Sequence, residues 1–479
     1  MGSLNSHGYS EDDLQAVFGP ASQGMIPEDR AATSDRVFVR SQVQITFDNE
    51  RAKGRKIAAP EALSTFGWEI LLNIAREGAT TLVQTIDEPA ITIRKRRTDL
   101  NLDQQQVARH LNLPLQVIAK AEIAGELSKI RDLEKICQLL SIDERSLGMV
   151  RGGHSDKNLA VRLRTLSDDT EHFNFTPTSV MNFSEAAWVI SRQDALAKKL
   201  NSFSNERNVP VFQKDNNYSH PAWKQGFRLA AITREKLGIS ADEPIEKLRH
   251  IVDTKLDISL IQQKFSSRFA GATLANGECR GIVINEEGAN SHVWIRRMTL
   301  CHELGHLLWD PDQRLNQLKV DHYNRIDSFD FRRFKDPVEE RANAFAVAFL
   351  APPIAVEKIV EDSSSILTAI SKLMRVYGIS ASAAKRHIQN VTRRKTDQVS
   401  AYELPFPSDD WIGRENFTLD WFPAKSTPLS RRGKFAWIVA LALQRKKISS
   451  DSAAMFLNIA PEEAINKCHQ VLDAYTDTE

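Results

Sequence analysis

Cysteine is scarce in this sequence of 479 residues, and its four cysteines are scattered without a CxxC pair. This spacing argues against a cysteine-based zinc knuckle and favours a reducing compartment. No apolar run reaches the roughly 18 residues of a membrane-spanning helix, and the N-terminus lacks the basic-then-apolar order of a signal peptide. The net charge of +1 argues against a uniformly basic nucleic-acid binder, although it permits a local basic face. We therefore expect a cytoplasmic protein with no membrane segment.

The composition is that of an ordinary globular protein, with 42% hydrophobic and 26% charged residues. The patterning predicts a predominantly helical α+β protein with several domains. The expected regions are an N-terminal arm and helix (1–85), a set of four or five short helices (86–150), a helical connector (151–215), an α+β domain (216–395) and a C-terminal helical region (396–479). Within the first region, residues 1–58 fit either a partly disordered arm or a small element with weak signals, whereas 60–86 fit one amphipathic helix.

Short β-prone runs lie between 257 and 285, and Asn276-Gly277 between two of them predicts a hairpin. We expect these runs to form a small antiparallel sheet. A helix follows at "IRRMTLCHELGHLLW", and a long polar loop (310–336) then leads to a second helix, "PVEERANAFAVAFLAP". The two helices carry the residues of greatest chemical interest.

The first helix contains two histidines four residues apart, with a glutamate directly after the first. Residues i and i+4 of an α-helix lie about 40° apart, so His302 and His306 can present two imidazoles to one cation. Glu303 is rotated by about 100° from His302, which suits a general base acting on a water at the metal better than a third ligand. The alternative is a core helix with buried, hydrogen-bonded histidines.

The second helix offers a third ligand, which a catalytic zinc site requires in addition to an open position. Glu339 and Asn343 share one helical face with small alanines, which would let the two helices approach closely. Glu339 can bind the metal, and Asn343 can hydrogen-bond the outer nitrogen of a ligand histidine. Glu340 faces elsewhere and is the weaker candidate. The alternative is a surface acidic pair that begins a helix.

These segments carry a resemblance to a known family. The run "IVIN…IRRMTLCHELGHLLW…EERANAFAVAFLAPP…VYGISASAAKRHIQN" resembles the ImmA/IrrE family of metallopeptidases, over roughly 218–395. The resemblance implies a zincin-like domain with zinc at His302, His306 and Glu339, and with Glu303 catalytic. It also implies that the substrate is a repressor-like DNA-binding protein, cleaved in a stress, phage or mobile-element response.

The activity predicted from these residues is that of a zinc endopeptidase. His322 or Tyr323 is a candidate for stabilising the oxyanion, although the spacing does not establish this role. Two alternatives remain open. One is a transcription regulator whose metallopeptidase-like domain acts as a sensor or contact module, and the other is a component of a toxin–antitoxin or defence system.

A second resemblance lies in "LDQQQVARHLNLPLQVIAKAEIAG" (102–125), which has the layout of a Cro/repressor-type (XRE) helix-turn-helix. Gln116 and Lys120 would face outward and reach base edges of double-stranded DNA, while Arg94 and Arg96 would contact phosphates. The alternative is a small helical packing module whose basic run is a solvated face. The C-terminal helices (431–475) show a weaker helix-turn-helix pattern.

Overall fold

The computed structural model describes residues 5–145, 147–149, 158–160, 162–163, 175–201, 210–213, 221–265, 269–315, 319–321 and 336–476. Its contacts divide the chain into two compact units, of which unit 1 comprises 1–205 with 422–479 and unit 2 comprises 206–421. The predicted C-terminal region 396–479 is therefore shared between the units. Within the described residues no single helix has both the length and the apolar composition to cross a membrane, although one bent pair would meet these two criteria together.

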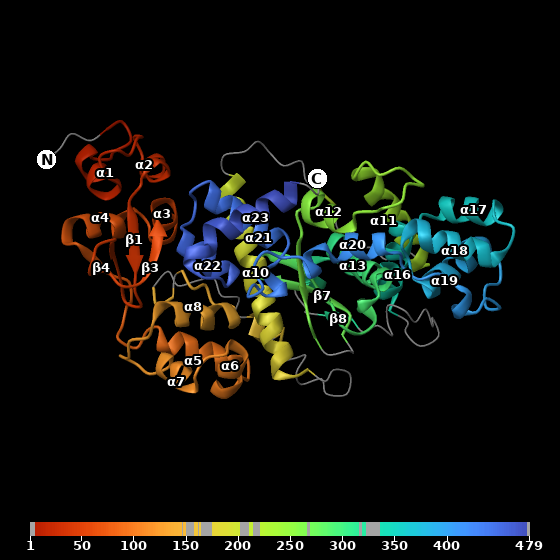
Figure 1. The fold of residues 1–479 in the computed structure, drawn as a ribbon, viewed down its shortest axis with the longest axis horizontal. Coiled ribbons are helices and arrows are strands. Elements are labelled where there is room, and N and C mark those ends of the chain that lie inside the picture. The colour runs from red at the N-terminus through yellow and green to blue at the C-terminus, as the bar shows by residue number, and fades with distance from the viewer. Residues whose placement is uncertain are drawn as a thin grey trace. The chain divides into compact units, whose positions relative to one another are not determined.

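The N-terminal part of unit 1 is a small α/β element (Figure 1). Its helices and strands are α1 (Glu11–Phe18), α2 (Pro27–Thr33), β1 (Val37–Arg40), β2 (Gln44–Phe47), β3 (Arg55–Ala58), α3 (Ala59–Phe66), α4 (Trp68–Glu77) and β4 (Ala79–Thr81). The strands form an antiparallel sheet in the order β3-β1-β2-β4, and Phe38, Ile45 and Ile57 bury its apolar side. Of the two readings of residues 1–58, the structure supports the small element with weak signals.

The single helix predicted over 60–86 is wrong. Helix α3 ends at Gly67, which has φ of +84°, and α4 ends at Gly78 in the left-handed conformation with φ of +85°. Glycine adopts positive φ without the steric cost that a Cβ imposes, so each glycine ends one helix and redirects the chain. The chain after Gly78 consequently enters strand β4 rather than a further helical turn.

The next part of unit 1 is helical, with four helices between 90 and 139, as predicted. They are α5 (Ala90–Asp99), α6 (Gln104–Leu111), α7 (Leu115–Ala121) and α8 (Ile130–Leu139). Asp103 caps α6 through a capping box with Gln106, and Asn112 ends it in the left-handed conformation with φ of +51°. The long helix α10 (Pro177–Asn201) confirms a helix within the predicted connector. From the C-terminal part of the chain come α21 (Lys434–Gln444), α22 (Ser450–Leu457) and α23 (Ala464–Thr476).

Unit 2 contains a second four-stranded sheet, which is mixed. Its strands are β5 (Ser259–Gln263), β6 (Gly271–Asn276), β7 (Cys279–Asn285) and β8 (Lys319–Asp321), in the order β5-β7-β6-β8. The predicted hairpin joins β6 to β7 through Gly277 at φ of +61°. The prediction of a purely antiparallel sheet is wrong, because β5 pairs with β7 in parallel. The hairpin places β6 on one side of β7, which leaves the other side for β5. Strand β5 runs in the same direction as β7.

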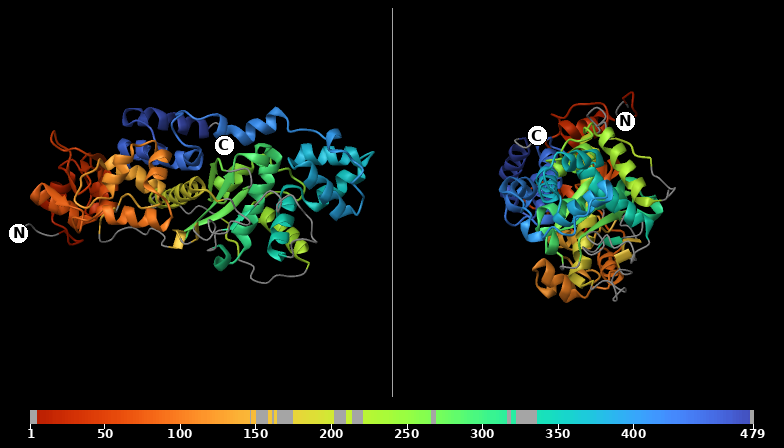
Figure 2. Two further views of the ribbon diagram at one scale, coloured as in Figure 1. Left: turned by 90° about the horizontal axis from the view of Figure 1, so that it is seen from below. Right: turned by 90° about the vertical axis from the view of Figure 1, so that its right-hand side faces the viewer.

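The other described elements of unit 2 are mainly helices. They are α11 (Ala222–Lys236), α12 (Leu248–His250) with a π-helical turn (Ile251–Lys255), α13 (Val293–Trp309), α14 (Asp312–Leu315), α16 (Pro337–Leu350), α17 (Pro353–Glu361), α18 (Ile366–Tyr377), α19 (Ala381–Thr392) and α20 (Asp409–Asp420). Helices α17 to α19 form a compact group (Figures 1 and 2). Helix α13 packs between the sheet and α16, and α16 also contacts α11. One apolar core runs through these elements, so the metal-ligand candidates on α13 and α16 stand on a rigid base.

Candidate metal centre

Helix α13 brings the two histidines to one face. It is buried along nearly its whole length, with β6 and β7 on one side and α16 on another. His302 is fully buried and His306 is 6% exposed. Their Nε2 atoms lie 3.1 Å apart, as the i, i+4 spacing predicts for two imidazoles that point to one place.

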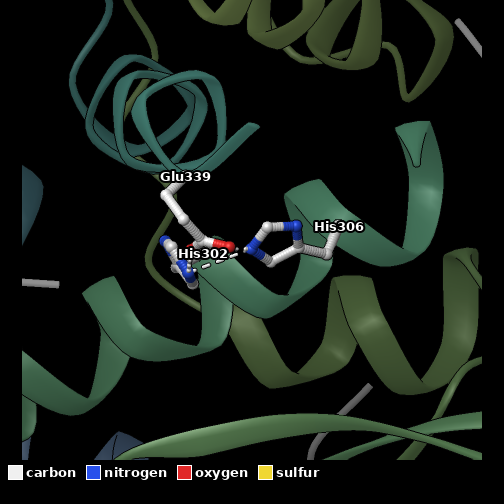
Figure 3. Close-up of side chains that lie close together, drawn as sticks. All are labelled: His302, His306 and Glu339. Atoms are coloured by element: carbon white, nitrogen blue, oxygen red, sulfur yellow. Dashed lines mark hydrogen bonds and ion pairs between the residues drawn. The ribbon is translucent and has the colours of Figure 1, made fainter. Parts of the chain in front are cut away.

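Helix α16 supplies the third side chain of the group. Glu339 extends from the first turn of α16 towards the two imidazoles (Figure 3). Its Oε2 atom lies 3.4 Å from Nε2 of His302 and 3.4 Å from Nε2 of His306. One ligand atom from each of the three residues lies within 4.8 Å of the others. The close approach depends on Gly305, because a Cβ there would lie 2.8 Å from the Phe345 ring of α16.

The outer nitrogen of each imidazole has its own hydrogen-bond partner. Nδ1 of His302 lies 3.0 Å from Oδ1 of Asn343, the residue predicted for this contact, and Nδ1 of His306 lies 2.8 Å from Oδ2 of Asp310. Because both partners offer an oxygen, each Nδ1 donates its hydrogen, and each imidazole in its neutral form then presents Nε2 as the acceptor. Both histidines are thereby prepared to bind a cation through Nε2.

Asp310 was not identified from the sequence, although a signal was present. It lies four residues after His306, which is the spacing of neighbours on one helical face. Its carboxylate also forms ion pairs with Arg341 of α16 and with Arg314, which lies four residues further along the chain. The helical spacing could have suggested Asp310, whereas its contact with Arg341 depends on tertiary packing.

Charges in the group are strongly coupled. Burial disfavours a charge on His306, but the carboxylates of Asp310 and Glu339 outweigh it and hold the pKa of His306 well above its usual range. Burial likewise opposes ionisation of Glu339, yet His306 and His302 hold the pKa of Glu339 well below its usual value. The site thus stabilises a positive charge between the ligand atoms, and a metal ion would compete with a proton for it.

Glu303 lies on the side of α13 that faces strand β6, and it is outside the three-residue ligand group. It is 1% exposed, and its Oε2 accepts a hydrogen bond from the Thr273 hydroxyl of β6 at 3.1 Å. A Cβ at Gly271 of β6 would lie 2.8 Å from Oε1 of Glu303, so only glycine leaves room for this carboxylate. Strand β6 therefore fixes the orientation of the predicted general base.

Glu340 and Cys301 are sequence neighbours of the ligand candidates, but neither belongs to the ligand group. Glu340 is outside the three-residue group, in agreement with its weaker ranking. Cys301 is fully buried in the core, and burial raises the pKa of its thiol. The candidates for oxyanion stabilisation, His322 and Tyr323, lie outside the described residues.

The two arginines predicted to contact phosphates differ in position. Arg96 is buried, and its Nε donates to the Leu140 carbonyl at 2.9 Å, so the prediction that Arg96 contacts a phosphate is wrong. Sequence pattern placed Arg96 in a basic run, but the inward face of α5 turns it towards α8. Arg94 is exposed and donates to the Glu122 carbonyl.

The two predicted base contacts lie on α7. Gln116 and Lys120 are both exposed, one turn apart on this helix. Lys120 Nζ lies 3.5 Å from Oε2 of Glu126, and both side chains are about half exposed. An exposed ion pair of this kind contributes little to stability, so Lys120 can leave it for another anion.

Comparison with known families bears on unit 2. A family model described as the IrrE N-terminal-like domain (Peptidase_M78) matches residues 272–389. The matched region contains both histidines, Glu303, Glu339 and Asn343. This match supports the resemblance to the ImmA/IrrE family and indicates a metallopeptidase-like domain. No curated protein matches the chain.

The side chains present fit a bound metal ion. Among the described residues, the buried Oε2 of Glu339 has no hydrogen-bond partner, although two imidazole nitrogens lie 3.4 Å away. A buried carboxylate oxygen without a hydrogen bond is costly, and a shared cation would satisfy it together with both Nε2 atoms. Two neutral imidazoles and one carboxylate are a donor set that suits zinc.

Proposed function

We propose that the protein is a zinc-dependent endopeptidase, with His302, His306 and Glu339 as ligands and Glu303 as the catalytic residue. The observation that carries this proposal is the convergence of the two histidine Nε2 atoms with a carboxylate oxygen of Glu339. The buried Glu303 directly follows His302 on α13. Three protein ligands would leave a position for water and substrate, which is the arrangement of a catalytic rather than a structural zinc site.

The chain's own residues would divide the work of peptide hydrolysis. Zinc, when bound, would supply a Lewis acid for the peptide carbonyl. Glu303 would accept a proton from the attacking water at its carboxylate and then donate it to the leaving amine. Thr273 would hold that carboxylate in place through its 3.1 Å hydrogen bond. Asn343 and Asp310 would keep the two imidazoles in the tautomer that exposes Nε2.

A second candidate function is that of a sensor or contact module in a transcription regulator. Strand β8, which follows α13 and α14 in the chain, pairs with the outer edge of β6 opposite Gly271 and Thr273. An extended peptide substrate could bind to such a strand edge by main-chain hydrogen bonds. In this structure β8 already occupies that edge of β6, the strand that contacts Glu303, so a substrate could not pair there. This observation favours the sensor, whereas the complete set of ligand candidates with Glu303 favours the enzyme.

We further propose that a repressor-like protein is the substrate and that double-stranded DNA binds helices α6 and α7. The family resemblance supports the first proposal. The second is supported by the capped helix α6, the left-handed turn at Asn112 and the exposed residues Gln116 and Lys120 on α7. Arg94 remains the candidate for a phosphate contact.

The peptidase proposal is tested first by the metal. Purified protein should contain about one zinc ion per chain, and either His302→Ala or Glu339→Ala should remove it, because two ligands are too few for tight binding. New protein N-termini in cells should appear with the wild type and be absent with His302→Ala. Full zinc occupancy in both variants would refute the ligand assignment.

The DNA proposal predicts a strong dependence on salt. Contacts between basic side chains and phosphates release counterions, so the affinity for duplex DNA should fall steeply as salt rises. Replacing Gln116 and Lys120 together by alanine should relax sequence preference more than it weakens non-specific binding. Lys135→Ala, which removes an exposed charge from α8, is the matched control and should change neither. If the wild type does not bind duplex DNA, or if the double variant binds it with unchanged affinity and sequence preference, the DNA proposal is refuted. Helices α5 to α8 would then be a small helical packing module.

A further inference from the structure

Arg314 contacts one candidate metal ligand, Glu339, from outside the ligand group. It lies on α14, four residues after Asp310, and its side chain is 18% exposed. Its Nη2 donates to Oε1 of Glu339 at 2.7 Å, and its Nε lies 2.9 Å from Oδ2 of Asp310. The same Nη2 lies 3.5 Å from Oδ2 of Asp336. The guanidinium thus faces three carboxylates, one of them on a predicted ligand.

The two oxygens of Glu339 have different surroundings. Arg314 binds Oε1, whereas Oε2 faces the Nε2 atoms of His302 and His306. A glutamate carboxylate can bind a metal through one oxygen or through both, and a long side chain has several rotamers. The hydrogen bond from Arg314 restricts this freedom, because it holds Oε1 away from the metal position and leaves Oε2 in place.

The second contact of Arg314 reaches the site through Asp310. Oδ2 of Asp310 lies 2.8 Å from Nδ1 of His306 and 2.9 Å from Nε of Arg314. Arg314 consequently contacts the ligand candidate Glu339 directly. It reaches the second ligand candidate, His306, through Asp310. The planar guanidinium is suited to this task, since its donors lie in a fixed fork that can serve two carboxylates at once.

We propose that Arg314 is a positioning residue of the metal centre, which holds Glu339 as a one-oxygen ligand and keeps Asp310 against His306. This inference rests on the metal site of the proposed function. The guanidinium faces carboxylates of the protein itself, so its charge is satisfied within the chain rather than directed at a substrate. Its effect on the reaction would therefore act through Glu339 and His306.

The sign of the effect on metal affinity separates positioning from simple electrostatics. Removing a cation beside a cation site would strengthen metal binding if charge repulsion dominated. Removing a residue that orients a ligand weakens metal binding, typically by about 10- to 100-fold. Arg314→Gln should therefore raise the dissociation constant for Zn²⁺ by about 10- to 100-fold. Arg314→Lys keeps the positive charge but loses the forked arrangement of donors. Its dissociation constant for Zn²⁺ should therefore lie between those of the wild type and Arg314→Gln.

The experiment uses the full chain after removal of metal by a chelator. Zn²⁺ is titrated against a chromophoric competing chelator, and Co²⁺ is added separately to record the visible absorption of the bound ion. Arg414→Gln is the matched control, because Arg414 lies in the same unit and pairs with the surface carboxylates of Asp410 and Glu246. We expect this control to match the wild type in both measurements. In Arg314→Gln, a second Glu339 oxygen on the ion would raise the coordination number and weaken the visible bands of Co²⁺.

The outcomes distinguish this inference from the proposed function. If the wild type binds neither ion, the metal site itself is refuted, and the peptidase proposal with it. If the wild type binds and Arg314→Gln binds equally or more tightly with the same Co²⁺ spectrum, only the role of Arg314 is refuted. A lower unfolding temperature of the metal-free variant with unchanged affinity also overturns it, since that result describes a purely structural ion pair. Partial recovery of affinity in Arg314→Lys, with a folded far-ultraviolet spectrum, supports it.

Discussion

A Glu303→Gln variant should keep its zinc and its fold while losing cleavage of any true substrate. The glutamine amide has nearly the size and shape of the carboxylate, but it cannot accept a proton from water. General-base contributions are typically about 10²- to 10⁴-fold, so the cleavage rate should fall by that factor, close to background. Zinc should remain because Glu303 lies outside the three-residue ligand group. The measurement is zinc content together with substrate integrity and biological output in cells.

Glu340→Gln is the matched control for this variant. It makes the same chemical change on α16, next to a ligand candidate but outside the ligand group. We expect normal zinc content and normal cleavage. A Glu303→Gln protein that retains full biological output, with no cleaved partner in either strain, would replace the peptidase reading by the sensor. Regulation by contact alone would survive the substitution because the surface of the protein hardly changes.

The core of the candidate site followed from helical periodicity. The i, i+4 spacing on two helices placed His302 with His306 and Glu339 with Asn343, and the structure brings these four residues together. Periodicity specifies only which residues share a face of one helix. It could not indicate that α14 turns back so that Arg314 reaches Glu339, because that contact depends on the path of the chain after α13.

The fold was predictable where elements are long or carry strong local signals. The hairpin at Gly277 has a turn residue with a physical requirement for positive φ, and it formed as expected. The N-terminal sheet has strands of three or four residues, which are too short for alternation to be read with certainty. The parallel pairing of β5 with β7 depends on strand order, which hydrophobic pattern does not encode.

Close packing between α11 and α16 carries the second large effect. Gly226 on α11 lies against the backbone of α16, and a Cβ built there would lie 2.8 Å from Cβ of Ala344 and 2.8 Å from the backbone nitrogen of Phe345. The carbonyl oxygen of Arg341 would be closer still. Backbone atoms cannot rotate away as a side-chain end can, so an added methyl group must push the helices apart.

Gly226→Ala should therefore destabilise the protein by about 3 kcal/mol, at the upper end of the usual cost of overpacking. Helix propensity alone predicts the opposite sign, because alanine is favoured over glycine by about 1 kcal/mol inside a helix. Gly413→Ala on α20 is the matched control: a Cβ there meets nothing within 4 Å among the described residues, so this variant should be neutral or slightly more stable.

Thermal unfolding of both glycine variants, followed by tryptophan fluorescence, gives the comparison. We expect a clear drop in the unfolding midpoint for Gly226→Ala alone. Because α16 also carries Glu339, displacement of this helix should weaken zinc binding in the same variant, while Gly413→Ala binds zinc normally. Equal midpoints and equal zinc affinities in the two variants would mean that α11 and α16 can separate without cost. The metal ligands would then not depend on this helix contact for their positions.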